Sequence, residues 1–586
     1  MGFTRLLFAA CCALTVLAIP NSIIDPRSRK DKCRCIPGDK CWPEVKEWST
    51  LNSTVKGRLT ATTPLASVCH DPTYNAVECD NLKQVWTLPE THQFSPAEFD
   101  APYFQNGSCD PFGPRTTPCT LGNYASYSIE VTEADDVAAA FDFARKRNIR
   151  LTIKNTGHDF LGKSAGKGSL ELWTHNLKDA SFIPNYGSRA YSGAAVKLGA
   201  GLTTAEAYLF AHQHGVQVAG SSCATVGIAG GYTSGGGHNP LMGHYGLAAD
   251  NVLEWEVVLS SGEHVIAKPD GDYKDLYWAL SGGGAGTFGV VLSLTTKAHT
   301  DVPTGGARMT IPAAGISADS FWDVVLAYYS TLMPVLDQGT YVTALLTQDM
   351  LVVYAATALN RTAAQVSDQF QPFQKYLHDK AIPYTKNFTY YDNFYDHMNN
   401  YLGPYPNGGL GPVSQLTGGH LARKDVFATK NSTQKLVDAL RTITSTGQYI
   451  FGMNAFNMDS TQTARDANKP ELHAVMPTWR DTRVHFVAVA GWDYTIPKQQ
   501  MVDRQHDMAT RILPILKAAT PGKGTYLNEA NFEEPDWQDE FYGPNYPRLS
   551  KIKRTYDADQ LLYARTAVGS EYWSEDRDGR LCTIKY

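Results

Sequence analysis

Two residues of the chain combine a reactive side chain with a glycine-rich surrounding. His158 lies in the stretch LTIKNTGHDFLGKSAG, where an alternating apolar run stops at Lys154 and a loop of small residues begins. Cys223 lies in a second such stretch, SSCATVGIAGGYTSGGGH. Glycine permits positive φ angles and lets backbone N–H groups approach a ligand closely. Several such loops are suited to wrap one extended, phosphate-bearing cofactor, whereas tight turn packing alone is the alternative interpretation.

A third glycine motif does not predict a dinucleotide-binding site of the Rossmann type. The run GAGTFG, from Gly284 to Gly289, matches the pattern G-x-G-x-x-G. That fingerprint requires a strand before it and a helix after it, so that the pyrophosphate meets a helix N-terminus. Here the helix-like KDLYWAL precedes the motif and the strand-like VVLSLTT follows it. We therefore expect no Rossmann site.

The elements around the first loop form a βαβ pattern. The run YSIEV alternates like a strand, and Thr132 opens the helix TEADDVAAAFDFARKRN with Asp135 at the capping-box position. The strand IRLTIKN follows, so the loop with His158 leaves the end of the second strand.

A second unit of the same kind is predicted next. The strand AVKLGAG leads into a helix capped by Thr203, with Glu206 three residues on and Gly215 at the end, and the strand VQVAG follows. His212 and His214 fall in the last turn of this helix, where they suit the helix dipole better than a metal site.

The length of 586 residues exceeds what one core supports, so two lobes are expected. The first closes near Thr300 after a hairpin around Ser261-Gly262. Residues 310–500 mix helices with strands such as VHFVAVAGW, which predicts a lobe with a mostly antiparallel sheet covered by helices. The segment from about 520 is expected to return to the first lobe. The predicted fold class is therefore α+β.

The N-terminus predicts export. Arg5 precedes an apolar stretch from Leu6 to Ala18 that is too short to span a bilayer, which indicates a signal peptide rather than a buried first helix. Five N-x-S/T sequons predict N-glycosylation; they start at Asn52, Asn106, Asn360, Asn387 and Asn431. The net charge of −6 argues against nucleic acid or an anionic membrane as a partner. The oligomeric state and the final compartment, for example a vacuole, stay open.

The cysteines fit an oxidising compartment. Nine remain after the predicted signal, and seven of them lie between Cys33 and Cys119. This density predicts an N-terminal extension held by disulfides, whose pairing the sequence does not give. Nine is an odd number, and Cys223 lies far from the others, so it is the candidate for the unpaired thiol.

At this point a resemblance to a known family becomes specific. The motifs NTGHDF, GAGLTTAEA, SSCATVGIAGGYTSGGGH, YGLAADNVLEWEVVLSSGE and DLYWALSGGGAGTFGVV resemble, in order, the PCMH-type FAD-binding domain of the vanillyl-alcohol-oxidase (VAO) superfamily, in its berberine-bridge-enzyme-like branch. VMPTWRD and the tail YLNEANFEE…FYGPNYPRLSKIKRTYDAD extend the likeness, and the tail is similar to fungal isoamyl-alcohol-oxidase-like members. The resemblance covers residues 115–575 and leaves out the Cys-rich start.

The resemblance implies five segments. They are a signal peptide at 1–18, a Cys-rich extension at 19–114, the FAD-binding domain at 115–301, a substrate domain at 302–519 and a C-terminal segment at 520–586 that returns to the FAD domain.

The resemblance also implies FAD attached at two points. His158 matches the histidine bonded to the flavin 8α-methyl, and Cys223 matches the cysteine bonded to ring carbon 6. Imidazole and thiolate are nucleophiles suited to an electron-poor oxidised flavin. A hydrogen-bonded loop histidine and an inert buried thiol are the alternatives. Ala224 follows the cysteine where this branch often has proline, which weakens that half of the match.

Further residues are implied to contact the cofactor. Val226 occupies the position that gates oxygen, where a valine resembles the oxidases rather than the dehydrogenases. The contacts to the pyrophosphate are expected from Asn155, Thr156, Gly157 and Asp159, and those along the flavin from Thr225, Gly227, Gly230, Gly231, Gly235 and Gly236.

The proton-accepting group is implied by a Y-x-N segment, Tyr526-Leu527-Asn528. Tyr526 is the expected catalytic base, although a phenol needs neighbours that stabilise its phenolate, and a packing tyrosine is the alternative. Asn528 and Asn545 are expected to contact the ring system or to cap turns. Other candidates for the pocket wall are His420, Arg423, Trp479, Arg480 and His485, with a surface salt bridge as the alternative for Arg480. The second lobe lacks the glutamate base of the alkaloid-cyclising members.

Together these observations predict a secreted FAD-dependent oxidase. It would pass hydride from an alcohol or secondary metabolite to FAD and reduce O2 to H2O2, with no metal involved. A flavin dehydrogenase, an oxidative cyclase of natural-product biosynthesis and a catalytically silent secreted flavoglycoprotein are the alternatives.

Overall fold

The first sheet carries the predicted βαβ unit. In this computed structural model, which describes residues 33–408, 414–461, 465, 472–576 and 578–584, the sheet has the order β1-β2-β4-β3. Its strands are β1 (Leu59–Ala61), β2 (Tyr127–Glu130), β4 (Ser169–Trp173) and β3 (Arg150–Lys154), and β2 and β3 both run parallel to β4. The predicted signal peptide lies outside the described residues.

Helix α5 (Ala134–Arg147) connects β2 to β3, as predicted. Its capping box differs from the prediction by one residue, because Glu133 is the N-cap and Asp136 is the residue that bonds back to it. Thr132 donates to the Asp136 carboxylate through its backbone N–H at 2.9 Å and its hydroxyl at 3.2 Å.

The second predicted βαβ unit is wrong as a parallel unit. Thr203 and Glu206 do form the capping box of α6 (Thr204–Gln213). However, β6 (Ser192–Gly199) lies antiparallel between β5 (Ala180–Gly187) and β10 (Val290–Lys297), whereas β7 (Val216–Gln217) pairs with β11 (His299–Thr300). Strand β5 is the sequence neighbour of β6, but β10 and β11 come from about 90 residues further along the chain, which local periodicity does not reveal.

The rest of this five-stranded sheet, ordered β5-β6-β10-β8-β9, agrees with the sequence. Strands β8 (Val252–Val258) and β9 (His264–Ala267) form the predicted antiparallel hairpin. Helix α8 (Lys274–Leu280) precedes the GAGTFG loop and β10 follows it, which is the reverse of the order a Rossmann site needs. Short helices α7 (Met242–Tyr245) and η5 (Ala248–Asn251) lead into β8.

The second lobe contains a seven-stranded antiparallel sheet in the order β15-β12-β14-β13-β17-β18-β16. The strands are β12 (Thr304–Pro312), β13 (Tyr341–Leu346), β14 (Met350–Leu359), β15 (Thr385–Tyr391), β16 (Gln415–Arg423), β17 (Ile450–Ala455) and β18 (Thr482–Gly491). The predicted antiparallel sheet is thus confirmed.

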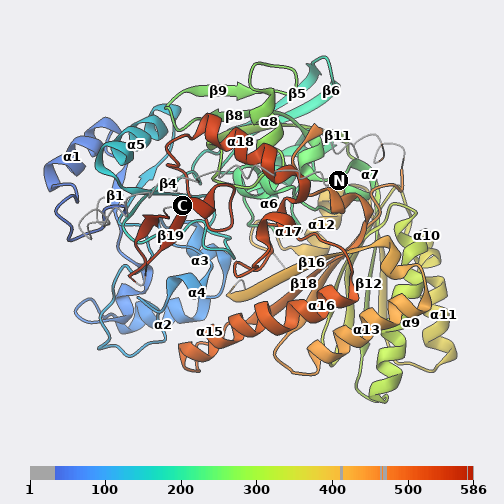
Figure 1. The fold of residues 1–586 in the computed structure, drawn as a ribbon. Helices are drawn as coiled ribbons and strands as arrows, with labels where there is room; N and C mark the ends of the chain where they lie inside the picture. The colour runs from blue at the N-terminus through green and yellow to red at the C-terminus, as the bar shows by residue number, and fades with distance from the viewer. Residues whose placement is uncertain (1–32, 409–413, 462–464, 466–471, 577, 585–586) are drawn as a thin grey trace, which may run out of the picture. The chain divides into compact units, whose positions relative to one another are not determined.

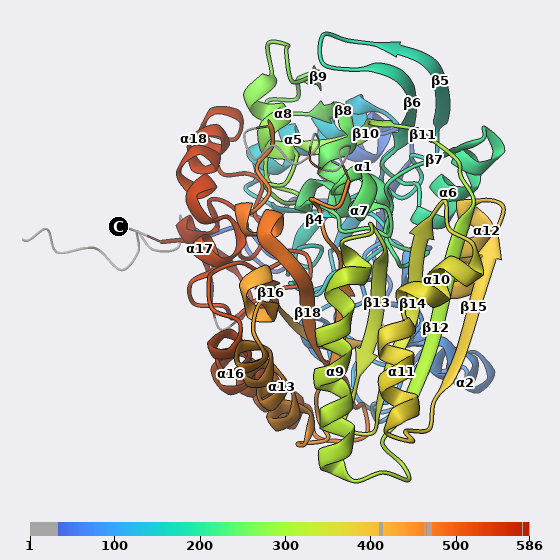
Figure 2. The ribbon, with the colours of Figure 1, turned by 90° about the vertical axis from the view of Figure 1, so that its right-hand side faces the viewer.

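Helices cover one face of this sheet, as Figure 2 shows for α9 and α11. They are α9 (Ala318–Leu336), α10 (Ala363–Gln369), α11 (Gln371–Asp379), α13 (Lys430–Thr444), α15 (Lys498–Asp507) and α16 (Leu513–Ala519), with α12 (Phe394–Leu402) beside β12, β14 and β15. Apolar side chains of α9, α13 and the strands form one buried cluster. Burial of this amphipathic face is the main stabilisation of the lobe.

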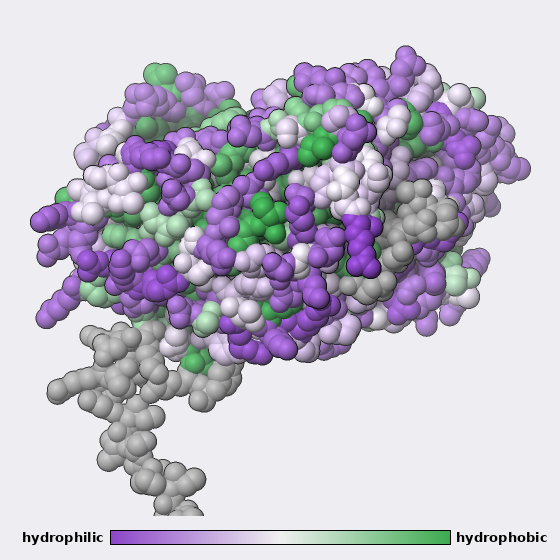
Figure 3. All heavy atoms as spheres, turned by 90° about the horizontal axis from the view of Figure 1, so that it is seen from above, coloured by the Kyte–Doolittle hydropathy of each residue, from purple (hydrophilic) through white to green (hydrophobic). Residues whose placement is uncertain are grey.

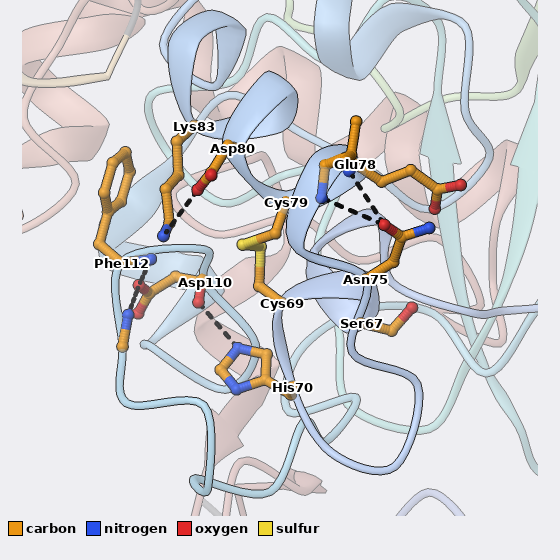
Figure 4. Close-up of a disulfide and its surroundings, with 12 residues drawn as sticks. Ser67, Cys69, His70, Asn75, Glu78, Cys79, Asp80, Lys83, Asp110 and Phe112 are labelled. Carbon is orange, nitrogen blue, oxygen red and sulfur yellow. Dashed lines mark hydrogen bonds and ion pairs between the residues drawn. A yellow bond between two sulfur atoms is a disulfide. The ribbon is translucent and has the colours of Figure 1, made fainter.

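The Cys-rich extension holds more helix than its sequence indicates, namely α1 (Val45–Thr54), α2 (Ala76–Val85), α3 (Pro89–Gln93) and α4 (Pro102–Gln105). Disulfides join Cys35–Cys41, Cys69–Cys79 and Cys109–Cys119, while Cys33 and Cys582 are also disulfide-bonded. Figure 4 shows Cys69–Cys79, where the disulfide ties the chain before His70 to helix α2, which Asn75 caps. Among the cysteines that the structure describes, Cys223 is the unpaired one, as predicted.

The C-terminal segment has contacts with both lobes, and Thr525 donates to the carbonyl of Gly419 on β16 of the second lobe at 3.1 Å. Helix α18 (Tyr546–Tyr556), red in Figure 1, lies beside α8, and Lys553 donates to the carbonyl of Thr287 at 2.7 Å. The remaining elements are α17 (Trp537–Phe541), β19 (Trp573–Glu575) and β20 (Leu581–Thr583). The domain limits at 115, 302 and 520 stay predictions.

The surface in Figure 3 is mostly hydrophilic, with small hydrophobic patches between the polar side chains. Within the described part of the chain, none of the helices has the length and apolar character needed to cross a bilayer.

Candidate active site

A cavity opens where the glycine loops of the first lobe meet the C-terminal segment. Its empty space is about 1430 Å³, open solvent at the mouth included. Four stretches build the walls: the loop after β3, the loop after β7, the GAGTFG loop and the segment around Tyr526. The predicted residues that line it are Asn155, Thr156, Gly157, His158, Asp159, Val226, Gly227, Gly230, Gly231, Tyr526 and Asn528.

Glycines leave room in this cavity for a flat, extended ligand. A Cβ atom built on Gly231 would have nothing within 4 Å, and one on Gly286 would approach only Ile153, at 3.8 Å. Gly157 has φ +95°, and a Cβ there would lie 3.1 Å from the carbonyl oxygen of Glu98, so the bend of the His158 loop requires glycine. The lining fits FAD because backbone can approach a cofactor at each of these positions.

His158 and Cys223 come together at one hydroxyl group. Nε2 of His158 lies 2.7 Å from Thr225 Oγ1, and Cys223 Sγ lies 3.6 Å from the same oxygen. Burial, with a smaller contribution from His92, lowers the pKa of His158 to about 4, so its ring is neutral at physiological pH. Burial raises the pKa of the Cys223 thiol. A neutral imidazole that lines the cavity and a thiol thus contact the same hydroxyl group, that of Thr225.

Several predicted contact residues have other roles. The side chain of Asp159 accepts the backbone N–H groups of Leu161 at 3.1 Å and Ser164 at 2.6 Å, which shapes the loop. Asn155 donates to the carbonyl of Ala200.

Five of the predicted site residues are not among those that line the cavity, namely Cys223, Thr225, Gly235, Gly236 and Asn545. A Cβ on Gly235 would collide with Asn528, and one on Gly236 would face Val475. Asn545 donates to the carbonyls of Ala474 and Val475, at 3.1 and 3.2 Å, so it fixes that turn.

Two charged residues close to the His158 loop were not predicted from the sequence. Lys163 lines the cavity, and burial lowers its pKa to about 8. Its position inside the His158 loop was the available signal. Asp100 belongs to the Cys-rich extension, yet its Oδ2 lies 3.9 Å from His158 Nδ1, and burial raises its pKa to about 7. Nothing local in the sequence connects it to that loop.

A second group of polar residues lines the cavity around Tyr526. Asn528 donates to the hydroxyl of Tyr526 at 2.8 Å. His238 and Glu529 also line the cavity, and His238 Nε2 lies 3.0 Å from Glu529 Oε1. Both were missed, although they stand in the quoted motifs, in GGGH and directly after Asn528. Burial and the nearby Glu529 raise the pKa of Tyr526.

Aromatic side chains back this end of the cavity. Trp479 packs edge-on against Tyr526 with ring centroids 5.4 Å apart, and His485 does so at 5.6 Å. Phe456, Met458, Val475 and Met476 belong to the same buried cluster. Trp479 and His485, which the sequence suggested for the pocket wall, therefore lie in the layer behind Tyr526.

The other pocket candidates lie elsewhere. Arg480 is largely buried and holds Asp250 with two bonds, from Nη1 to Oδ2 at 3.0 Å and from Nη2 to Oδ1 at 2.9 Å, so neither alternative in the sequence reading was right. His420 is buried against the hydroxyl of Thr520, and Arg423 is partly exposed near Asp425 and Asp481.

One cluster among the described residues is compact enough to raise the question of a metal ion. Ligand atoms of His238, His485 and Glu529 lie within 4.8 Å of one another. Both ring nitrogens of His238 already have partners, Glu529 and the hydroxyl of Tyr341 at 3.1 Å. We therefore interpret the cluster as a hydrogen-bonded network.

Comparisons with known proteins agree with this geometry. A family described as "FAD binding domain" matches residues 125–268, and one described as "Berberine and berberine like" matches residues 525–569. The chain is 41% identical to FAD-linked oxidoreductase ZEB1 of Gibberella zeae, over 94% of this chain and 95% of the relative. It is 44% identical to the bifunctional decalin synthase calF of Penicillium decumbens over the full length of both.

Solved structures show the same fold. The VAO-type flavoprotein MtVAO615 of Myceliophthora thermophila superposes with a TM-score of 0.90 at 41% identity, covering 94% of this chain and all of that one. Berberine bridge enzyme from Eschscholzia californica gives a TM-score of 0.64 at 15% identity, over 89% of this chain and 98% of that one, which is a likeness of fold alone.

The fold and the cavity thus define an FAD-binding oxidoreductase with two lobes. The chain belongs to the FAD-linked oxidoreductases of the vanillyl-alcohol-oxidase family, in the branch that resembles berberine bridge enzyme.

Proposed function

We propose that this protein is a secreted oxidase that removes hydride from a hydroxyl-bearing small molecule, with FAD attached through both His158 and Cys223. The observation that carries this proposal is the shared contact with Thr225 of the Cys223 thiol and of the His158 imidazole, which itself lines the glycine-rich cavity. The two expected attachment points belong to the same ring of the flavin, so two nucleophiles this close together suit a double attachment.

Bound FAD would supply the acceptor for a hydride and return the electrons to O2, giving H2O2. The residues of the chain would hold the cofactor and orient it. Lys163 would meet the pyrophosphate, and the glycine loops would admit the flat ring system. The neutral ring of His158 keeps a lone pair available for bond formation. Tyr526, the residue singled out by the Y-x-N segment, would meet the substrate with its hydroxyl, which Asn528 holds.

The preference for O2 as acceptor rests on Val226, which lines the cavity at the expected gating position. A relative from Thermothelomyces thermophilus that is 41% identical carries the name VAO-type flavoprotein oxidase. Release of peroxide in air, in proportion to substrate consumed, is the expected result for an oxidase.

A ring-forming oxidation is the second candidate, and the observation that favours it is the 44% identity to calF, a decalin synthase, over the whole chain. It would use the same cavity on a secondary metabolite. A product with one ring more and two hydrogens fewer than the substrate would favour this candidate.

Secretion is supported by the disulfides Cys35–Cys41, Cys69–Cys79 and Cys109–Cys119, which form in oxidising compartments. The sequons at Asn106, Asn360, Asn387 and Asn431 are exposed, so they are accessible to glycosylation.

The test is the colour of acid-precipitated protein. Wild-type protein should stay yellow, and the variants His158→Ala and Cys223→Ala should each keep flavin through the remaining link. The double variant should release all its FAD on precipitation. The matched control is His214→Ala, at the end of α6, which should behave like wild type. Loss of colour from precipitated wild-type protein would contradict the covalent proposal, whatever the activity.

A further inference from the structure

Glu529 is the ionisable carboxyl group that lines the cavity next to Tyr526. It lines the cavity with a side chain that is 24% exposed, whereas His238 is 7% exposed and His485 is fully buried. Glu529 lies three residues after Tyr526, on the same turn of the C-terminal segment, so both groups face the same end of the cavity.

One oxygen of this carboxylate is fixed from behind. Oε1 lies 3.0 Å from Nε2 of His238, whose Nδ1 lies 3.1 Å from the hydroxyl of Tyr341. Tyr341 in turn donates to Oδ1 of Asn454 at 2.9 Å. Tyr341 lies on β13 and Asn454 on β17 of the second lobe, so the sheet of that lobe orients the His238–Glu529 pair.

The other oxygen has no comparable partner. Oε2 lies 3.6 Å from Nδ1 of His485, which is longer than a hydrogen bond. In the described part of the chain, neither ring nitrogen of the buried His485 has a hydrogen-bond partner. An unpaired buried nitrogen is costly, and a hydroxyl group placed beside Oε2 would offer these atoms a partner.

Charge separates the roles of Glu529 and Tyr526. The titratable groups that face Glu529 are His238, His485, Tyr341, Tyr526 and Tyr232. Burial would raise the pKa of Glu529, but His238, followed by His485, brings it below its usual range. The carboxylate is therefore ionised at neutral pH, whereas the pKa of Tyr526 is raised and its phenol keeps its proton.

We propose that Glu529, oriented by His238, is the catalytic base of the reaction, and that the site accepts an uncharged alcohol. This inference rests on the proposed function. The O–H bond of the alcohol breaks and its proton forms a bond to Oε2. The carbinol C–H bond breaks at the same time and the carbon–oxygen double bond forms; bound FAD would accept the hydrogen with its electron pair. The two electrons and two protons that the alcohol loses would leave with O2 as H2O2, so that Oε2 is free to accept a proton again.

The same geometry defines the substrate class. The cavity lining includes the apolar side chain of Val226 and the rings of Tyr232 and Tyr526, and the buried Trp479 packs behind Tyr526. An ionised Glu529 repels carboxylate and phosphate substrates. The phenol of Tyr526, held by Asn528, acts as a positioning group rather than as the proton acceptor. A neutral benzylic, allylic or secondary alcohol with an apolar body fits both features.

The test follows bleaching of the flavin under anaerobic conditions between pH 4.5 and 9. A panel of benzylic, allylic and secondary alcohols is screened, and the alcohol that reduces the wild-type protein fastest is used for the variants. General base catalysis contributes about 10² to 10⁴-fold, so Glu529→Gln should slow reduction at least about 100-fold at every pH. Tyr526→Phe should slow it less than about tenfold and keep the wild-type pH profile.

Two further variants separate catalysis from folding. Glu529→Asp keeps the charge and should recover part of the loss seen in Glu529→Gln. His238→Asn removes the group that keeps the pKa of Glu529 low. The acid limb, where the rate falls as the carboxylate is protonated, should therefore move to higher pH. Covalent flavin content should equal that of wild type in all four variants.

The outcomes are distinct. Reduction of Glu529→Gln at more than a tenth of the wild-type rate would overturn the inference. A rate that rises with pH from neutral upward and is abolished in Tyr526→Phe would assign the proton to Tyr526 and overturn it as well. Wild-type flavin that none of the alcohols reduces would refute the proposed function itself.

Discussion

The pair formed by Asp250 and Arg480 joins the two lobes beside the cavity. Asp250 lies on η5 of the first lobe, and Arg480 lies on η8 (Pro477–Asp481), next to Trp479. The guanidinium makes two parallel bonds to the carboxylate, at 2.9 and 3.0 Å, and His473 contacts the same carboxylate. The substitution Arg480→Ala leaves a buried negative charge without its main partner.

The cost follows from these contacts. A hydrogen bond to a charged group contributes about 1.5–3 kcal/mol, and removal of one partner of a buried ion pair costs about 3–5 kcal/mol. For the compact unit from Arg34 to Tyr586, roughly 550 residues, the unfolding entropy is about 1.2 kcal/mol per kelvin. Arg480→Ala should therefore lower Tm by about 3–4 °C at pH 7.

The effect should depend on pH with a defined sign. Burial would raise the pKa of Asp250, but Arg480 and His473 hold it well below its usual range in the folded protein. The pair therefore stabilises the wild type above the unfolded pKa of about 4, and this stabilisation is lost as the pH falls below that. Without Arg480 the folded carboxylate takes up a proton more readily, so the Tm difference should narrow between pH 7 and pH 4.

Thermal unfolding followed by circular dichroism at pH 4, 5.5 and 7 measures both effects. Arg480→Lys, which keeps the charge but loses the paired geometry, should fall between wild type and alanine. Arg423→Ala, at a partly exposed arginine of the same lobe, is the matched control and should change Tm by less than about 1 °C. A Tm of Arg480→Ala within 1 °C of wild type at pH 7, or a difference that does not narrow in acid, would refute the reasoning.

Two further predictions concern the cofactor. Because the pKa of the Cys223 thiol is raised by burial, reconstitution of apoprotein with FAD should form the cysteine link more slowly at pH 6 than at pH 8, as mass spectrometry of flavin peptides would show; equal rates would contradict this. In the His158→Ala, Cys223→Ala background, Lys163→Met should weaken FAD binding about 10 to 100-fold, measured by flavin fluorescence. With Lys163 present the affinity should fall as pH rises through about 8, whereas the methionine variant should show no such change.

Local patterns in the sequence predicted the parts of the fold that depend on neighbours in the chain. The capping box at Thr203 and Glu206 was correct because such a box involves residues three apart. The unpaired state of Cys223 followed from its isolation among the cysteines. The glycines around His158 indicated a cradle because few other residues tolerate that loop's backbone.

The remaining features depend on contacts between distant segments. Strand β10 pairs with β6 and strand β11 pairs with β7, and both come from near residues 290–300. The helical pattern between β6 and β7 therefore did not fix a parallel sheet. The His238–Glu529 pair joins residues far apart in sequence, and neither carries a pattern of its own. Arg480 gave no signal of its buried partner, because an arginine after a tryptophan fits a surface as well as a core.

The Cys-rich extension packs against the loop that carries His158. The N–H of Asp100 donates to the carbonyl of Gly157 at 2.9 Å, and Lys154 at the end of β3 donates to the carbonyl of His92 at 3.0 Å. The family match begins only at residue 125. A protein shortened to that boundary would lose the hydrogen bonds of Asp100 and His92 to this region. Recombinant protein should therefore include the extension and be folded under oxidising conditions before cofactor is added.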